Sequence, residues 1–242
     1  MLQSAPVEGF LIAVSSRGAQ SSLAQIVTAD GLFQATCLRG MGGGKSFPLA
    51  AVIGALCRFE GSRKSDSHPY CIESYTVLEP SPLTGRNLAA NLAFMMAAEV
   101  IVKVFSTCSL LAGYRRFVAR MSQGEIWAGL LDLLVEGIIL SGIRPNTRAC
   151  ASCGQESDLI AFDLAAGGFL CRDCCLDPTE AVTGRKNLLA YRYLFETPLE
   201  ERQTSRLEPS FLRGAVQDCV SYLETYFNIR IETLPTLLNL YK

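Results

Sequence analysis

Two cysteine pairs are the residues whose type and spacing point most directly to chemistry. Cys150 and Cys153 form one C-x2-C pair, and Cys171 and Cys174 form a second. Zinc prefers four tetrahedral ligands, and thiolates suit it well. Each pair places two sulfurs on one turn, and the separation of the pairs by residues 154–170 is usual for zinc ribbons. The sequence therefore predicts one structural Zn²⁺ bound by these four cysteines.

Four sulfur ligands leave no open coordination position, so a site of this kind stabilises a fold and does no hydrolysis. The alternatives are a cluster of buried cysteines and a redox pair. Redox chemistry of the thioredoxin type would need a C-x2-C at the start of a helix in a βαβ context, which this stretch lacks. Cys175 is a second candidate for the fourth ligand, although standard knuckle spacing favours Cys174.

Little else in the chain offers catalytic chemistry. The single histidine, His68, lies in a polar stretch, so the sequence gives little basis for a histidine-dependent catalytic triad. Residues 40–46 look like a phosphate-binding loop but have one residue too few before the Gly-Lys-Ser triplet. Acidic residues such as Glu99, Glu125 and Glu136 stand singly on expected helices. We therefore expect no enzymatic activity.

Composition places the chain among globular proteins. It has 242 residues, of which 49% are hydrophobic and 19% charged, with a net charge of −1 and a pI near 5.9. The N-terminus lacks the features of a secretory signal, and the longest apolar stretch, residues 88–105, is interrupted by polar residues, so neither secretion nor a membrane span is expected. In the reducing cytosol clustered cysteines bind metal, and five of the ten cysteines are expected to be small buried hydrophobes: Cys37, Cys57, Cys71, Cys108 and Cys219.

The sequence pattern in the first third of the chain is typical of short strands. Five runs of β-prone residues are separated by turn residues: 9–15, 23–28, 32–38, 50–59 and 70–78. This spacing predicts a small all-β barrel.

Helical periodicity dominates the rest of the chain. Helices are expected at 85–105 (capped by Thr84), 109–121, 125–140, 184–196 and 208–227. Between them, residues 159–164 and the Gly167-Gly168 turn predict a hairpin that leads into the second cysteine pair. The expected domain ranges are 1–81 (barrel), 82–144 (helical, first part), 145–178 (inserted zinc ribbon) and 179–242 (helical, second part).

Basic residues gather locally although the total charge is slightly negative. Six of them are candidate contacts with nucleic acid: Arg39, Lys45, Arg63, Lys64, Arg115 and Arg116. The first four lie in loops of the expected barrel, where such folds bind single strands, and the last two lie on one helix. Three phenylalanines could stack on bases or pack in the core instead: Phe33, Phe47 and Phe59. The alternative for the arginines on the helix is a solvated helix face.

With these motifs the chain resembles RecO, a family of bacterial recombination mediators. Residues 8–33 are similar to the opening strands of the family's OB-fold, and residues 39–49 to its glycine-basic segment. The closest correspondence is in residues 150–174, which contain both cysteine pairs and both glycine elements. Residues 41–44 depart from the family, which has basic residues there, and this implies fewer phosphate contacts and a shallower salt dependence.

The resemblance implies an α+β multidomain protein with an N-terminal OB-fold barrel, an α-helical domain and an inserted four-cysteine zinc ribbon. It implies a cytoplasmic, nucleoid-associated protein of DNA repair and recombination that is not an enzyme. RecO proteins bind single- and double-stranded DNA, anneal complementary strands, pair with RecR, contact single-strand-binding protein and help RecA load. Arg39 and Lys45 match the family's basic segment, so DNA contact is carried over to them.

Three other functions stay open from the sequence. One is a zinc-ribbon adaptor between proteins that has weak DNA affinity. Another is a transcription-type zinc-ribbon factor, which would bind duplex DNA with a sequence preference. The third is an enzyme that uses a zinc-bound water, and the four-sulfur ligand set argues against it.

Overall fold

The computed structural model describes residues 2–3, 5–17, 21–38, 49–65, 68–83, 87–164, 166–175 and 184–241. The chain divides into two compact units, residues 1–126 with 232–242 and residues 127–231. We describe each unit by itself. The four domain ranges expected from the sequence remain a prediction.

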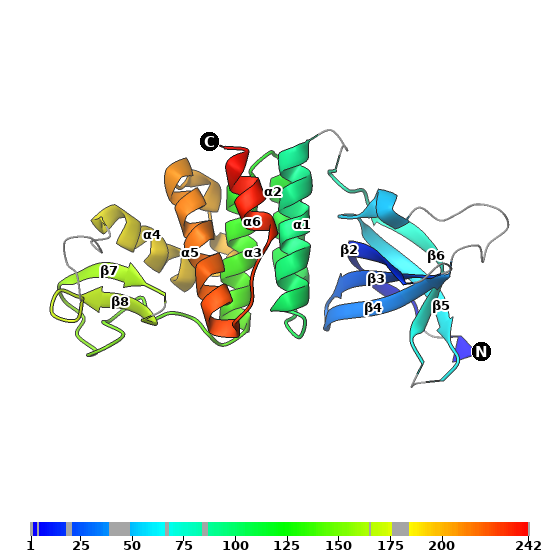
Figure 1. The fold of residues 1–242 in the computed structure, drawn as a ribbon, viewed down its shortest axis with the longest axis horizontal. Helices are drawn as coiled ribbons and strands as arrows, with labels where there is room; N and C mark the ends of the chain where they lie inside the picture. Colours follow the sequence, from blue (N-terminus) through cyan, green and yellow to red (C-terminus); the bar gives the residue numbers. More distant parts are fainter. Residues whose placement is uncertain are drawn as a thin grey trace. The chain divides into compact units, whose positions relative to one another are not determined.

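Five strands of the first unit form a closed barrel (Figure 1). They are β2 (Val7–Arg17), β3 (Ser21–Thr28), β4 (Gly31–Leu38), β5 (Leu56–Arg63) and β6 (Tyr70–Glu79). The order around the barrel is β2-β3-β4-β6-β5 and back to β2, with every pairing antiparallel except the parallel pair β4–β6. This Greek-key closure is the topology of an OB-fold, so the fold that the resemblance implied is confirmed. A short strand, β1 (Leu2–Gln3), pairs with the end of β5.

The barrel interior is filled by side chains that alternate along the strands. Leu11, Ala24, Ile26, Ala35 and Phe59 are among the fully buried residues of this core, as the two-residue period of a strand requires. Because Phe59 is 0% exposed, it is a core residue and offers no stacking face. Phe33 also packs against this core, and Phe47 lies outside the described residues.

The expected strand at 50–59 is wrong in its first half. A 3-10 turn, η1 (Leu49–Val52), precedes β5, which begins at Leu56. Gly54 has a φ of +84°, a left-handed conformation that interrupts an extended chain, and its N–H donates to the Leu11 carbonyl at 2.7 Å. A short apolar run does not by itself distinguish a strand from a helical turn.

Three helices complete the first unit: α1 (Leu88–Lys103), α2 (Leu111–Ser122) and α6 (Thr233–Asn239). The Asn87 side chain caps α1 by accepting a hydrogen bond from the Ala90 N–H at 3.0 Å, and the expected cap, Thr84, lies outside the described residues.

The third of these helices, α6, was not expected from the sequence. The Glu99 carboxylate of α1 accepts hydrogen bonds from the backbone N–H groups of Glu232 (2.8 Å) and Thr233 (3.1 Å) and from the Thr233 hydroxyl (2.6 Å). A carboxylate in this position satisfies donors at a helix N-terminus. This contact, 133 residues apart in sequence, explains why so short a helix forms there.

The second unit combines three helices with a hairpin. Its elements are α3 (Ile126–Leu140), β7 (Leu159–Asp163), β8 (Gly168–Cys171), α4 (Arg185–Glu196), the 3-10 turns η2 (Leu199–Glu201) and η3 (Thr204–Arg206), and α5 (Pro209–Phe227). The helices agree with the expected ranges to within a few residues. No helix in the described parts of either unit is long and apolar enough to cross a membrane.

A glycine in the barrel provides a test of this packing. We expect Gly61→Ala to destabilise the protein by about 2 kcal/mol or more, because overpacking in a tight site typically costs about 1–3 kcal/mol. Gly61 lies at an irregularity between β5 and β6, and a Cβ there would come within 2.0 Å of the Cys71 carbonyl oxygen. Urea unfolding, followed by circular dichroism, measures the change.

Gly214→Ala is the matched control. Gly214 lies within α5, and a Cβ at this position meets nothing within 4 Å. The same substitution there should stabilise the helix by about 0.5–1 kcal/mol. Equal effects of the two substitutions would contradict the close approach of β6 to Gly61.

Candidate metal centre

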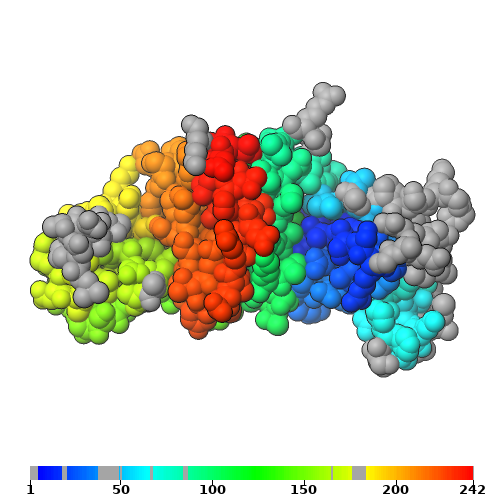
Figure 2. Space-filling view, viewed as in Figure 1, coloured from blue at the N-terminus to red at the C-terminus, as the bar shows by residue number. Residues whose placement is uncertain are grey.

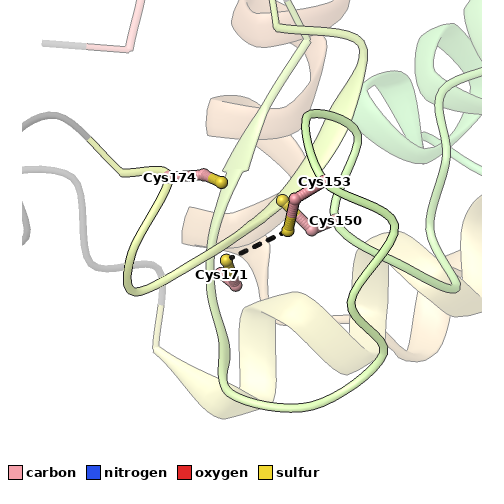
Figure 3. Close-up of side chains that lie close together, drawn as sticks. All are labelled: Cys150, Cys153, Cys171 and Cys174. Carbon is pink, nitrogen blue, oxygen red and sulfur yellow. Dashed lines mark hydrogen bonds between the residues drawn. The ribbon is translucent and has the colours of Figure 1, made fainter.

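Four cysteine sulfurs converge in the second unit (Figure 3). The Sγ atoms of Cys150, Cys153, Cys171 and Cys174 all lie within 4.8 Å of one another. The first two come from the loop that precedes β7, the third ends β8, and the fourth lies on the following turn. The structure therefore brings together the four residues that the sequence predicted as ligands.

The distances between the sulfurs fit a metal ion. The Sγ atoms of Cys153 and Cys171 are 3.7 Å apart, whereas a disulfide requires about 2.05 Å. A tetrahedral site with Zn–S bonds of about 2.3 Å has S–S edges of about 3.8 Å. The donor set and spacing thus fit a closed tetrahedral zinc site. Cys175 is buried, and its sulfur is not among the four that converge.

Crowding of the four thiols makes their acidities unequal. The backbone N–H of Cys171 lowers the pKa of the Cys150 thiol, burial opposes this, and the N–H groups of Cys153 and Ser152 add to the lowering, so that the pKa is about 6. Hydrogen bonds with the Cys153 and Cys171 thiols, burial and the charge of Cys150 raise the pKa of Cys174 to about 12. The four groups can all ionise only if a cation balances their charge.

The backbone around the sulfurs is shaped by two glycines and an asparagine. Gly154 has a φ of +78° and closes the first knuckle, with its N–H donating to the Cys150 carbonyl at 2.9 Å. Gly168 has a φ of +142°, and a Cβ on it would come within 2.1 Å of the Asn146 carbonyl oxygen. Residues 146–151 run beside β8, with backbone hydrogen bonds from Asn146 to Gly167 and from Phe169 to Asn146, both of 2.8 Å.

An aromatic cluster attaches the hairpin to the helices of its unit. The Phe162 ring of β7 stacks on the Tyr191 ring of α4, with centroids 3.9 Å apart and planes at 25°. Phe169 meets Phe162 edge to face at 5.6 Å, and Phe211 of α5 meets Tyr191 in the same way at 4.9 Å. The Tyr191 hydroxyl donates to the Asp218 carboxylate on α5. Figure 2 shows the ribbon residues (yellow-green) directly against α4 and α5 (yellow and orange).

Glu196 is the main polar contact between the ribbon and α4. Its carboxylate accepts hydrogen bonds from the Thr147 hydroxyl (2.8 Å) and from Arg148 (2.6 Å), and it forms an ion pair with Arg144 (2.8 Å). Burial alone would raise the pKa of Glu196, but the donors Arg148, Thr147 and Arg144 outweigh it and lower the pKa to about 2.

Sequence reasoning missed this residue. One signal was present, because Glu196 is the last residue of α4, and a carboxylate at a helix C-terminus is unfavourable unless partners compensate for it.

Two of the six basic candidates lie where β5 ends. The Arg63 guanidinium carbon is 5.9 Å from the ring centroids of both Phe33 and Tyr70, and Lys64 follows it as an exposed residue. Contact with two aromatic faces holds the guanidinium in a defined position. Arg39 and Lys45 lie outside the described residues.

The two candidates on α2 lie elsewhere on the barrel unit. Arg115 forms an ion pair with Glu79 and lies 5.5 Å from the Phe10 ring centroid, and Arg116 is half-buried. Glu79 pairs with Leu56 at one end of the β5–β6 ladder, whereas Arg63 ends β5 at the other. At about 3.3 Å per residue the strand separates them by roughly 20 Å. The structure therefore does not bring Arg115 and Arg63 into one patch.

Comparison with known proteins finds one matching family model and several relatives that match part of the chain. Residues 127–235, slightly less than half of the chain, match the family model described as "Recombination protein O C terminal". The chain is 32% identical over 108 residues to a DNA repair protein RecO from Rubrobacter xylanophilus, covering 42% of this chain and 44% of the relative. It is 30% identical over 93 residues to a DNA repair protein RecO from Bacillus mycoides, covering 38% of each chain. These matches thus span less than half the length of either relative.

Substitution of adjacent cysteines tests which thiol is the fourth ligand. We expect Cys174→Ala to lose the bound metal and Cys175→Ala to retain it, because only the Cys174 sulfur lies with the other three. Native mass spectrometry of freshly purified, reduced protein should show one zinc per chain for the wild type and for Cys175→Ala. Retention of zinc by Cys174→Ala together with its loss from Cys175→Ala would reverse the assignment.

Glu196 predicts a pH dependence of stability. The pKa of this carboxyl is about 2 in the folded protein against an ordinary value of 4.5, so the folded state gains stability above about pH 4.5 and loses it as the pH falls towards 2. Allowing for the solvent around Arg148, we expect Glu196→Gln to remove about 2 kcal/mol at pH 6. The difference in unfolding free energy between wild type and variant should shrink from pH 5 to pH 3.

Glu200→Gln is the control, since Glu200 is exposed in the same unit. Its effect on the free energy of unfolding should be small, because surface substitutions are usually within about 0.5 kcal/mol. Comparing each variant with wild type in the same buffer removes the shared effect of acid on the thiolates. A Glu196→Gln curve parallel to the wild-type curve would contradict the assigned ion pairs.

Proposed function

Because residues 127–235 of this chain match the RecO C-terminal region, we propose that the protein is a non-enzymatic mediator of recombinational DNA repair that anneals complementary strands. It binds single- and double-stranded DNA, acts with RecR on DNA coated by single-strand-binding protein and assists the loading of RecA. The observation that carries this proposal is an OB-fold barrel in the same chain as a RecO C-terminal region with its four-cysteine site. One structural Zn²⁺ at that site is part of the proposal.

The barrel offers a neutral strand face with cations at its loops. Gln25 of β3 pairs with Gln34 of β4, between positions whose side chains point into the core. In OB-folds this face and the loops corresponding to β2–β3 and β5–β6 bind oligonucleotides. Arg17 ends β2 and is exposed, Arg63 ends β5, and the exposed Lys64 follows it. Backbone contacts at these loops hold a strand, and base pairing between strands tests complementarity.

The described cations are not equivalent as phosphate ligands. Arg63 is held against the Phe33 and Tyr70 rings, which fix the position of its guanidinium. Arg115 is already paired with Glu79, so a phosphate would have to compete with a carboxylate. Arg63 and Lys64 therefore rank above Arg115 and Arg116 as contacts. Arg39 and Lys45 remain proposed contacts on the resemblance of their segment alone.

Ion pairing on the barrel favours a second candidate function, that of a protein-interaction adaptor with weak DNA affinity. Arg58 is paired with Glu8 at 2.6 Å and Arg115 with Glu79, so both guanidinium charges are locally balanced. Each phosphate contact that is missing weakens binding and flattens its salt dependence. A filter-binding titration at low salt separates the two functions.

Strand annealing tests the leading proposal. We expect Arg63→Gln with Lys64→Gln to slow annealing of complementary oligonucleotides about tenfold at low salt. The loss of two phosphate contacts should also reduce the slope of log affinity for single-stranded DNA against log salt by about 1–2. Fluorescence anisotropy gives the affinities, and quenching between labelled strands gives the rates, with and without single-strand-binding protein.

Arg115→Gln serves as the matched control, because its positive charge is balanced by Glu79. It should change the annealing rate less than the double variant does. Arg39→Glu with Lys45→Glu extends the test to the segment outside the described residues. Annealing at the wild-type rate by both double variants would reject the barrel loops as the DNA-binding surface.

A further inference from the structure

A pocket of about 770 Å³ lies between the hairpin and α5 in the second unit. Its apolar wall is formed by Phe162, Leu164 and Leu170 of the hairpin region, and α5 contributes Asp218 and Tyr222 among other residues. We call this the ribbon pocket. A volume of this size is within the range of sites that bury small ligands or a few side chains.

The described charged side chains that line the ribbon pocket are all acidic. Asp163 and Asp218 both line it, and the described lining residues include no lysine or arginine. The Asp218 carboxylate accepts from the Tyr191 hydroxyl, and the Asp163 carboxylate accepts from the Ala166 N–H at 3.2 Å. Among the described residues neither carboxylate forms an ion pair. The two negative charges are therefore oriented by neutral donors and lack a cationic partner.

The cysteine site adds to this charge. Cys174 lines the same pocket. Four thiolates around one divalent cation carry a net charge of about −2, so the zinc-loaded protein would present a still more negative wall. An apolar pocket edged by uncompensated negative charge selects against nucleic acid, whose phosphates it would repel, and favours a cation with an aliphatic stem.

We propose that the ribbon pocket binds an apolar segment of a partner protein that carries an arginine or lysine side chain. The apolar residues of the segment contact the hairpin wall, and the cationic group reaches Asp163 and Asp218. This surface differs in charge and location from the barrel loops, so the proposal stands independently of DNA binding by the barrel.

Peptide binding to the full-length, zinc-loaded chain tests the proposal. The probe is a short fluorescein-labelled peptide that alternates leucine with arginine, measured by anisotropy. We expect it to bind at least about tenfold more tightly than a leucine–glutamate peptide and than a serine–arginine peptide, a difference of about 1.4 kcal/mol. Asp163→Asn with Asp218→Asn should weaken its binding about tenfold, since the asparagines keep acceptors for Ala166 and Tyr191 but carry no charge.

The control variant is Glu200→Gln with Glu201→Gln, which removes two exposed charges of the same unit outside the pocket. It should leave binding unchanged. Should the double asparagine variant lose its zinc, Ser221→Lys, at an exposed pocket position on α5, supplies a competing cation and should weaken binding in its place. Equal binding of the arginine and glutamate peptides, or equal loss in pocket and control variants, would overturn the proposal.

Discussion

The close approach of four cysteine sulfurs is the constraint on which the ribbon depends. The sulfurs lie within 4.8 Å of one another, and the pKa of Cys150 is lowered to about 6 while that of Cys174 is raised to about 12. A divalent cation at the centre would even out these acidities, because it would favour the thiolate of every ligand. The hairpin strands span only five and four residues, and an isolated hairpin is at best marginally stable in water. The two cysteine-containing turns therefore have to supply the stability that the short strands lack.

The contacts that attach the ribbon to the helices of its unit are of a different kind from those among the sulfurs. The Phe162–Tyr191 stack and the contacts of Glu196 join the hairpin and its preceding loop to α4 without involving a sulfur. The four sulfurs thus converge within the ribbon, whereas aromatic packing and the Glu196 carboxylate connect it to the helices. The two sets of contacts share no residue.

Local patterns in the sequence were sufficient to predict some features of the structure, but other features depend on contacts between distant residues. The cysteine pairs, most of the strands and the five longer helices follow from short-range spacing, so they could be predicted. The strand expected at 50–59 was wrong in its first half because Gly54 has a left-handed conformation there, and its N–H donates a hydrogen bond to the distant Leu11 carbonyl. Glu196 and α6 depend on partners 48 or more residues away, such as Arg148 and Glu99. The basic candidates could be identified by charge, but the pairing of Arg115 with Glu79 appears only in three dimensions.

A net charge of −1 does not argue against DNA binding in a molecule organised in this way. At physiological ionic strength charges separated by more than about 8 Å are largely screened, so a phosphate responds to the cations beside it and not to the total. Arg63 and Lys64 stand together at a barrel loop, whereas Asp163 and Asp218 line a pocket without a described cation. The net charge is the sum of 22 basic and 23 acidic residues over the whole chain, so it does not describe either of these places. The charge that a ligand meets is set by the local arrangement.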